Sequence, residues 1–441
     1  MRKTWAQLGA AVLGLALVGA ACGGSEDKAS ETGAAAATAG QLVGMKGTTP
    51  LVKLSDDFKK KLSDAWVKAG NQPLKDYNYG AEAYDAVVVI ALAAEKAKTD
   101  GIDYAKEING ITRGGEKCKD FTSCKAIIAK GGDPDYDGIS GPLEFSGNCE
   151  PTKASFGVLQ FGKDNRLDDT KTVYKEASAP AAADVPQVPV EGTRAGDGTL
   201  KLGTIFPQAG SLAFLGPPEF AGFDLAIADI NAAGGVLGKP VVGIKGDSGD
   251  ATTDTVNQTT DRLLAEKVDA IIIGASSGVS LKVIDKITGA GVVQFSPANT
   301  SKTLSTYKDK GLYCRTAPSD VVQGAVLGAI VVGDGHKNVA IINRNDSYGV
   351  GLTEDLTKAI TEAGGKVVIT KTYDEKADKF NAEVNEIKAQ KPDAVVIIGF
   401  EESSKILSTM VEAGVGPTKI AVYGVDGNMG NALGESFDAG K

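Results

Sequence analysis

The part of the chain after residue 198 alternates short apolar runs with longer segments in which apolar positions recur at helical spacing. Strands are predicted at 200–206, 241–245, 268–273, 291–295, 339–343, 366–370, 394–399 and 420–423. Helices are predicted between them at 219–232, 253–266, 321–332, 352–363, 380–389 and 404–413. Strands that alternate with helices form parallel sheets with right-handed crossovers. Because two such series meet near Pro318, the pattern predicts an α/β fold with two doubly wound lobes.

The part before residue 175 has a less regular pattern. It predicts strands at 41–48 and 154–161, a turn and strand within 136–145, an amphipathic helix at 55–69, and short helices near 104–111 and Lys125. The segment 81–98 is apolar on nearly all faces, which is typical of a buried helix. Residues 175–197 are rich in Ala, Pro, Val and Gly and predict a semi-extended linker. This linker is the strongest internal boundary, and it separates 41–174 from 198–317 and 318–441.

The first 22 residues predict an export signal rather than part of the fold. A positively charged start precedes an apolar run at 8–18, which is too short for a comfortable transmembrane helix. The following Gly19-Ala20-Ala21-Cys22 is similar to a bacterial lipobox, which implies lipidation of Cys22. Cleavage near Ala21 without lipidation is the alternative. Residues 23–40 are interpreted as a flexible tether, so the sequence predicts an exported protein with a lipid anchor in the outer face of the cytoplasmic membrane.

Composition and charge narrow the function classes. The 441 residues include 42% apolar and 23% charged residues, as in a soluble globular protein. The formal net charge of −9, without a basic stripe, argues against a nucleic-acid partner. His336 is the only histidine in the sequence, so histidine-dependent catalysis and multi-histidine metal sites are almost excluded. Neither Gly-x-Ser-x-Gly nor a phosphate-loop Gly-Lys-Ser/Thr occurs, so we expect no enzyme, no cofactor and no metal.

Four cysteines remain after export, and an oxidising compartment permits disulfides among them. Four cysteines allow three pairings. Cys118 and Cys124 are close enough in sequence to close one small loop, and this pair is favoured. Cys149 and Cys314 would then form the second pair by elimination. The spacings do not match a zinc site.

Two polar loops follow neighbouring predicted strands. Gly274-Ala275-Ser276-Ser277-Gly278 comes after the run that ends at Ile273, and Ser296-Pro297-Ala298-Asn299-Thr300 comes after the run that ends at Phe295. Open α/β sheets hold ligands at the carboxyl ends of their strands. Small hydroxyls and the N–H groups of helix N-termini suit a carboxylate or another small anion. Ordinary turns with Ser or Thr helix caps are the alternative.

Five segments of the second half carry a family resemblance. They are a helix with a glycine-rich exit, the two polar loops, an Arg-Thr-Ala-Pro-Ser-Asp segment and an Asp-Ser-Tyr-Gly turn, at 226–238, 273–278, 295–300, 315–320 and 346–349. In this order they resemble the type I periplasmic binding proteins of the branched-chain amino acid class. The resemblance implies two lobes joined by a hinge, with the ligand held between them.

The order of the two halves differs from that of the family. The segments 79–80, 141–145 and 156–161 resemble the family's C-terminal part, yet they precede the block that starts at residue 198. The chain is therefore interpreted as a circular permutant, in which residues 175–197 join the family's original termini. A fusion of two half-proteins is the alternative. Permutation predicts that each lobe is discontinuous: 199–317 with 54–145, and 318–441 with 41–53 and 154–174.

The resemblance also implies a set of ligand-binding residues. Ser277 and Thr300 would hold the ligand carboxylate, and the Ala298 carbonyl would accept from its ammonium group. Asp426 lies where the family carries an acid that pairs with the ammonium, although that acid is often the longer Glu. Tyr348 and Tyr79 would face the ligand. Leu215 and Phe400 would line the side-chain pocket, and Leu215 stands where some relatives carry an aromatic ring.

Together these features predict a solute-binding lipoprotein that captures a small amino acid, branched-chain or otherwise aliphatic, and delivers it to an ABC permease. Closure of the lobes would be a hinge motion that the ligand drives by binding the closed state better. The alternative within the same fold is a ligand-sensing receptor or an engineered permuted biosensor for an amide, urea or a small carboxylate.

Overall fold

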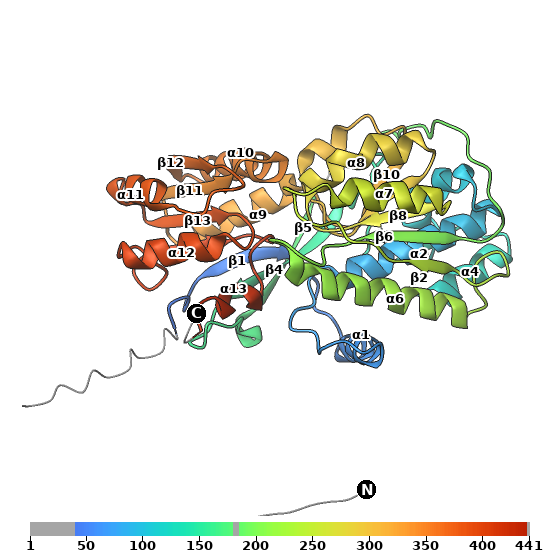
Figure 1. The fold of residues 1–441 in the computed structure, drawn as a ribbon, viewed down its shortest axis with the longest axis horizontal. Helices are drawn as coiled ribbons and strands as arrows, with labels where there is room; N and C mark the ends of the chain where they lie inside the picture. The colour runs from blue at the N-terminus through green and yellow to red at the C-terminus, as the bar shows by residue number, and fades with distance from the viewer. Residues whose placement is uncertain (1–39, 180–184, 439–441) are drawn as a thin grey trace, which may run out of the picture. The chain divides into compact units, whose positions relative to one another are not determined.

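The computed structural model describes residues 40–179 and 185–438, which form two α/β lobes built on separate sheets (Figure 1). The first lobe contains a five-stranded sheet and the second lobe a seven-stranded sheet. The predicted export signal, the lipidation site Cys22, residues 23–39 of the tether and residues 180–184 of the linker lie outside the described residues. No helix within 40–179 and 185–438 combines the length and the apolar character that a membrane crossing requires.

The sheet of the first lobe has the strand order β10-β9-β8-β6-β7, and all of its pairings are parallel. Its strands are β6 (Lys201–Ile205), β7 (Val242–Ile244), β8 (Ala270–Ile273), β9 (Val293–Ser296) and β10 (Tyr313–Arg315). Its longer helices are α1 (Asp56–Lys68), α2 (Gly80–Ala97), α4 (Phe121–Ala129), α6 (Gly216–Ala232), α7 (Thr255–Ala265) and α8 (Ser277–Gly289). Shorter helical turns are η1 (Ile102–Glu107), α3 (Ile108–Ile111), η3 (Ala213–Leu215) and η4 (Lys302–Thr306).

Helix α2 forms the centre of the first lobe although it comes from the other half of the sequence. All of its residues from Gly80 to Ala94 are buried, and it packs against α6, β8 and β9. Gly222 of α6 makes the close approach possible, because a Cβ there would lie 2.1 Å from the Gly80 carbonyl oxygen. The burial predicted from the apolar pattern of this helix is confirmed.

The sheet of the second lobe has the order β12-β11-β13-β14-β1-β4-β5. Its strands are β1 (Lys46–Pro50), β4 (Lys153–Gln160), β5 (Val173–Ser178), β11 (Asn338–Arg344), β12 (Lys366–Tyr373), β13 (Ala394–Ile398) and β14 (Ala421–Gly424). Its helices are α9 (Asp320–Gly333), α10 (Ser347–Glu362), α11 (Asn381–Ala389), α12 (Ser403–Glu412), α13 (Asn431–Glu435) and the turn η2 (Asp169–Lys171). Strand β1 pairs in parallel with β14 and antiparallel with β4, so the two ends of the described chain meet in one sheet.

Several predicted elements differ from the observed ones, for reasons of backbone conformation. The predicted strand at 41–48 begins only at Lys46, because Gly40 and Gly44 have positive φ angles of 88° and 85° and form a turn. The predicted strand near 143–145 is replaced by one isolated bridge, because Leu143 and Glu144 have φ angles of 59° and 50°. The helix expected near 104–111 is divided between the 3₁₀ helix η1 and the short α-helix α3.

The segment interpreted as a semi-extended linker is more ordered than its composition suggested. Its first residues belong to β5, which pairs antiparallel with β4. The described residues after 184 lie against the first lobe through Arg194, which donates to Asp269 Oδ1 at 2.5 Å and to the Gly291 carbonyl at 3.1 Å. Asp100 accepts hydrogen bonds from the backbone N–H groups of residues 197–199. Polar contacts therefore fix a segment that has no secondary structure.

The four described cysteines form two disulfides. Cys118 is bonded to Cys124, beside a small parallel sheet of β2 (Glu116–Cys118) and β3 (Pro134–Tyr136). Cys149 is bonded to Cys314 of β10, at a sequence separation of 165 residues. The second bridge ties the segment that leads into β4 of the second lobe to the edge of the first-lobe sheet.

Candidate functional site

The two polar loops lie side by side at the carboxyl edge of the first-lobe sheet. They follow β8 and β9, which pair in parallel with Ile272 opposite Phe295. The N-cap of α8 is Ser276, whose hydroxyl accepts from the Val279 N–H at 3.3 Å. Ser277 is therefore not the cap, and its hydroxyl instead accepts from the Ser301 N–H of the neighbouring loop at 3.2 Å. The N-cap of η4 is likewise Ser301 rather than Thr300.

One enclosed cavity, which we call the inner site, brings all the predicted ligand-binding residues together. It is lined by Tyr79, Leu215, Ser277, Ala298, Thr300, Tyr348, Phe400 and Asp426, together with Leu212, Ala275 and Gly427. Both lobes contribute to its walls, and each of the eight predicted residues is at most 5% exposed. The cavity measures about 10 Å³, which is room for about one water molecule. An amino acid therefore enters only if the lobes move apart.

Asp426 is the best-connected polar group of the inner site. Its Oδ2 accepts from the Tyr79 hydroxyl at 2.8 Å, and its Oδ1 accepts from the Tyr348 hydroxyl at 2.7 Å and from Gln323 Nε2 at 2.9 Å. Burial raises the pKa of the Asp426 carboxyl above its usual range, and these donors oppose that shift. Burial and the Asp426 charge raise the pKa values of Tyr79 and Tyr348 well above 10, so both tyrosines remain neutral donors.

A second buried acid, Asp320, lies close to Asp426. Asp320 begins α9, and Gln323, one turn later on the same face, reaches Asp426. The Asp320 N–H donates to the Thr300 carbonyl at 2.7 Å, which fixes the residue beside the inner site. Its carboxylate is fully buried and lies near the Thr300 hydroxyl, and neither of its oxygens has a hydrogen-bond partner of good geometry in the described structure. Burial and the Asp426 charge raise the Asp320 pKa well above its usual value.

The aromatic wall of the inner site is fixed from the second lobe. Phe400 stacks on Tyr348 with 5.5 Å between the ring centres. The Arg344 guanidinium lies 3.7 Å from the Phe400 ring centre. Arg344 is itself paired with Asp346, Glu402 and Glu375 at 2.6, 2.7 and 3.1 Å. A neutralised guanidinium behind the ring therefore holds Phe400 in place without adding a free positive charge to the site.

Arg315 supports the second polar loop, residues 296–300, through hydrogen bonds. It is fully buried, and its Nη1 donates at 3.0 Å to the carbonyls of Asn299 and Ser301. Its Nε donates to Glu150 at 2.9 Å, and its Nη2 contacts Glu150 and the Ser305 hydroxyl. Glu150 is adjacent to Cys149, so the ion pair and the disulfide anchor the same segment. The sequence identified Arg315 only as the first residue of the segment 315–320 that carries the family resemblance, because none of its partners is near it in a recognisable motif.

Two further buried acids lie beneath the first polar loop. Glu219 of α6 accepts from the Ala275 N–H at 3.3 Å, and its other oxygen is one of the buried atoms for which the described structure shows no hydrogen-bond partner. Glu82 of α2 is 4% exposed and lies close enough to Glu219 to disfavour its ionisation. Burial raises the pKa of Glu82 to about 8 and that of Glu219 well above its usual range. Burial thus favours the neutral form of both acids, which reduces the negative charge near the loop.

Replacing Glu82 with glutamine is expected to remove a pH dependence of stability. The folded-state pKa of about 8 lies above the usual 4.5, so the folded protein binds this proton more tightly than the unfolded chain does. The free energy of unfolding should therefore fall by about 4 kcal/mol as the pH rises from roughly 5 to 9. Glutamine mimics the neutral acid and should flatten this slope in urea unfolding curves. The exposed Glu116→Gln is the control, and equal slopes in wild type and Glu82→Gln would contradict the assignment.

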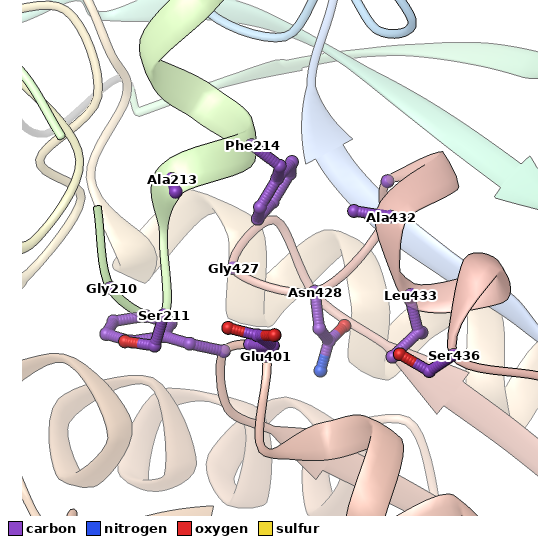
Figure 2. Close-up of a pocket in the computed structure, with 12 residues that line it drawn as sticks. Gly210, Ser211, Ala213, Phe214, Glu401, Gly427, Asn428, Ala432, Leu433 and Ser436 are labelled. Carbon is purple, nitrogen blue, oxygen red and sulfur yellow. The ribbon is translucent and has the colours of Figure 1, made fainter. Parts of the chain in front are cut away.

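A second, larger cavity lies next to the inner site, and we call it the outer cavity (Figure 2). It measures about 170 Å³ and shares Phe400 and Gly427 with the inner site. Figure 2 shows that Ala213 and Phe214 of the first lobe face Ala432, Leu433 and Ser436 of the second across this space. Sequence analysis did not identify this cavity, because its lining residues come from distant parts of the chain without a distinctive spacing.

The chemistry of the inner site fits a small zwitterion. The Ser277 and Thr300 hydroxyls come from the first lobe and the Asp426 carboxyl comes from the second lobe, and all three line the cavity. Within the described residues, no group of three or more His, Cys, Asp and Glu side chains is arranged to hold a metal ion. Hydroxyls and a carboxylate in one buried cavity are groups that can form charge-assisted hydrogen bonds.

Comparison with known proteins gives a family model and several relatives. A family model described as periplasmic binding protein matches residues 199–440, which is more than half of the chain. The Leu/Ile/Val-binding protein BraC3 of Rhizobium johnstonii is 27% identical over 257 residues, covering 55% of this chain and 69% of the relative. An amino acid binding protein of Pseudomonas aeruginosa is 26% identical over 216 residues, covering 48% of this chain and 58% of the relative.

Solved structures show a similar partial match. A leucine binding protein LivK of Thermotoga maritima has a TM-score of 0.49 and 24% identity, covering 54% of this chain and 67% of that one. The substrate binding protein LivJ of Streptococcus pneumoniae, solved in complex with isoleucine, has a TM-score of 0.46 and 28% identity. The match covers 52% of this chain and 64% of that one. The chain thus spans between about three fifths and two thirds of the length of most of the relatives it matches.

Proposed function

Because the chain belongs to the periplasmic binding protein family, we propose that it is an extracytoplasmic solute-binding protein whose lobes close on a small amino acid. The family consists of solute-binding proteins. Several relatives are named as Leu/Ile/Val-binding proteins. An aliphatic amino acid, and a branched-chain one in particular, is therefore the ligand we propose for this chain.

The observation that carries the proposal is the presence of two kinds of polar group, one from each lobe, in the walls of one buried cavity. Ser277 offers a hydroxyl at the N-terminus of α8, where the helix dipole and N–H groups without a partner in the helix favour a carboxylate, and Thr300 offers a second hydroxyl from the neighbouring loop. Asp426 offers a buried carboxylate from the second lobe, and the buried Asp320 lies close enough for the Asp426 charge to raise its pKa. Such groups recognise an amino acid by both its charged ends.

The remaining residues of the inner site are proposed to orient the ligand. The Ala298 carbonyl would accept from the ammonium group together with Asp426. Tyr348 of the second lobe would hold the Asp426 carboxylate through the hydrogen bond already present, and Tyr79 would donate to it from the first lobe when the lobes close. Leu215 and Phe400 would contact the side chain. Leu215 is shorter than an aromatic ring and leaves more space for the ligand side chain.

A thermal-shift screen of the purified protein tests the proposal. The panel contains all amino acids together with amides, urea and small carboxylates. A ligand that binds only the folded state raises the melting temperature, and at about 100 times the Kd it contributes about 2.7 kcal/mol. We expect shifts with leucine, isoleucine or valine. Shifts confined to ligands without an amine would refute the role of Asp426, and no shift with any amino acid would refute the function.

Two further properties are part of the proposal. A lipid anchor at Cys22 would hold the protein at the outer face of the cytoplasmic membrane, and an ABC permease would accept the ligand from the closed form. The lobes offer a hinge for this cycle, because the segment after β10 leads directly into α9 of the second lobe. Release of the ligand then requires the opposite motion.

We also propose that the sequence order is a circular permutation of the family's order. Two observations support it: the family match is confined to residues 199–440, and β1 from the start of the chain pairs with β14 from its end. A chain rejoined in the order 198–441 followed by 40–178 should then give the same ligand profile in the thermal-shift screen. Failure of the rejoined chain to fold cooperatively would argue for a fusion of two half-proteins instead.

A further inference from the structure

The disulfide between Cys149 and Cys314 joins two segments that pass from one lobe to the other. Cys149 lies in the segment 137–152, which connects β3, packed in the core of the first lobe, to β4 of the second lobe. Cys314 lies in β10, directly before the segment that leads into α9. Beside the bridge, the Arg315 N–H donates to the Cys149 carbonyl at 2.9 Å. A covalent bond and a hydrogen bond thus fix both segments to each other.

A series of polar contacts connects this bridge to the inner site. Glu150 follows Cys149 in the chain, is 6% exposed and accepts from Arg315 Nε at 2.9 Å. Arg315 in turn donates at 3.0 Å to the backbone carbonyls on both sides of Thr300, which lines the inner site. The position of Thr300 therefore depends on Arg315, and Arg315 depends on where the backbone holds Glu150.

The backbone at Cys149 does not favour this arrangement by itself. Its φ angle is 57°, a left-handed conformation that costs free energy for any residue other than glycine. Glu150 and Arg315 are both buried, and a buried ion pair offsets the loss of hydration only when its geometry is held closely. The disulfide supplies this constraint. Once the bond is broken, we expect Cys149 to relax towards negative φ and Glu150 to move away from Arg315.

Cys149 is the half of the bridge that a reagent reaches first. It is 8% exposed, against 2% for Cys314, and it lines a small cleft together with Gln187 and Val188. The Val188 N–H donates to the Gly147 carbonyl at 3.1 Å, so the chain that follows the linker covers this side of the bridge. Thiol–disulfide exchange therefore begins at Cys149 Sγ.

We propose that the Cys149–Cys314 bond is a redox switch for the inner site, which binds the amino acid tightly when the bond is formed and weakly when it is reduced. This inference rests on the proposed function. In reduction, a thiolate of a dithiol attacks Cys149 Sγ, and the Cys314 sulfur leaves as a thiolate and takes up a proton. The second thiol then displaces Cys149, so the protein gains two electrons and two protons and the dithiol becomes a disulfide. Oxidation by a disulfide donor is the reverse.

Calorimetric titration with leucine, before and after treatment with dithiothreitol, tests the switch. Thiol counting shows when both disulfides are reduced, and circular dichroism shows whether the protein stays folded. We expect leucine affinity to fall about fivefold or more on reduction, as for a typical coupling between two sites. The affinity should recover when oxidised glutathione forms the bonds again.

Serine variants assign the effect to one of the two bridges. Cys149→Ser/Cys314→Ser should bind leucine as weakly as the reduced wild type without any reductant. Cys118→Ser/Cys124→Ser is the matched control, because that bridge closes a loop between residues that do not line the inner site. The control should bind within about twofold of the oxidised wild type and should still lose affinity in dithiothreitol. Reduction of the wild type gives the answer even if the first variant does not fold.

Glu150→Gln tests the route from the bridge to the inner site. It removes the charge that pairs with Arg315 and leaves both disulfides in place. If the switch acts through this pair, dithiothreitol should change the leucine affinity of Glu150→Gln by less than about twofold. An equal effect of reduction in Glu150→Gln and in the wild type overturns the route.

The possible outcomes separate the switch from the proposed function. Equal leucine affinity of the oxidised and the reduced wild type overturns the switch and leaves the proposed function intact. Reduced protein that unfolds, or an equal loss in Cys118→Ser/Cys124→Ser, also overturns it, because the loss then does not come from the bond between Cys149 and Cys314. Oxidised wild type that binds no amino acid refutes the proposed function, and the switch falls with it.

Discussion

The Asp426→Asn protein is expected to bind amino acids about 100-fold more weakly than the wild type. Asparagine keeps the size of the side chain and one acceptor oxygen, so Tyr348 or Gln323 retains a partner. What is lost is the negative charge that a buried ammonium group needs. Removing one member of a buried charge pair costs about 2–5 kcal/mol, and 100-fold corresponds to about 2.7 kcal/mol. Calorimetric titration with leucine measures the change.

Asp320 allows a second test of the Asp426 prediction. Its pKa is raised partly by the Asp426 charge, so removal of that charge allows Asp320 to ionise more easily. Asp320 then replaces part of the lost attraction, and the double variant Asp320→Asn/Asp426→Asn should bind more weakly than Asp426→Asn alone. The exposed Asp378→Asn is the matched control and should bind like wild type. Unchanged leucine affinity in Asp426→Asn would show that the Asp426 carboxylate does not bind the ligand.

The local features of the fold could be predicted because they depend on local sequence. Strand and helix periodicity after residue 198 predicted the parallel sheets, and these are confirmed. The rule that parallel strands end at one edge of a sheet placed the loops at 274–278 and 296–300 together, as the pairing of β8 with β9 requires. Family resemblance supplied the residues of the second lobe, such as Tyr348 and Asp426, which no local pattern distinguishes from turn or core residues.

The features that sequence analysis missed depend on partners far away in the chain. Asp320 follows the N-cap Ser319 and resembles any acid in a first helical turn, so its burial beside Asp426 had no local signal. Glu219 and Glu82 belong to helices from different halves of the sequence and meet only because α2 packs on α6. Acids are rarely fully buried without a partner. The four buried acids near the inner site come together only when both lobes are assembled, so no local sequence pattern could indicate them.

Edge strand β5 was missed for a different reason. Four of its six residues between Val173 and Ser178 carry polar or charged side chains or are alanine, and most of the strand is exposed. The alternation of apolar and polar residues that indicates a half-buried strand is therefore absent. Its pairing with β4 is provided by the backbone and by the preceding turn η2. Composition alone assigned part of this strand to a linker.

Replacing Arg315 with glutamine is expected to destabilise the folded protein by about 3–5 kcal/mol, because it removes one member of a buried ion pair and leaves Glu150 without its charge partner. The carbonyls of Asn299 and Ser301 also lose their donor, and the loop that contains Thr300 is no longer fixed. Urea unfolding measures the loss of stability. Leucine titration of the folded fraction should also show weaker binding, although Arg315 does not line the inner site.

Arg262→Gln is the matched control for this prediction. Arg262 forms an exposed pair with Glu266 at 2.8 Å, and such surface pairs contribute about 0–1 kcal/mol. The loss of stability in Arg315→Lys should be smaller than in Arg315→Gln and larger than in Arg262→Gln. An ammonium group keeps the charge opposite Glu150 but cannot donate to both carbonyls and to Ser305 in the same planar arrangement. If Arg315→Gln and Arg262→Gln were equally stable, the loop at 296–300 would be fixed by its other contacts, among them the Asn299 Nδ2 bond to the Ala275 carbonyl at 3.0 Å. In that case the carboxylate side of the site would depend only on β8, β9 and α8.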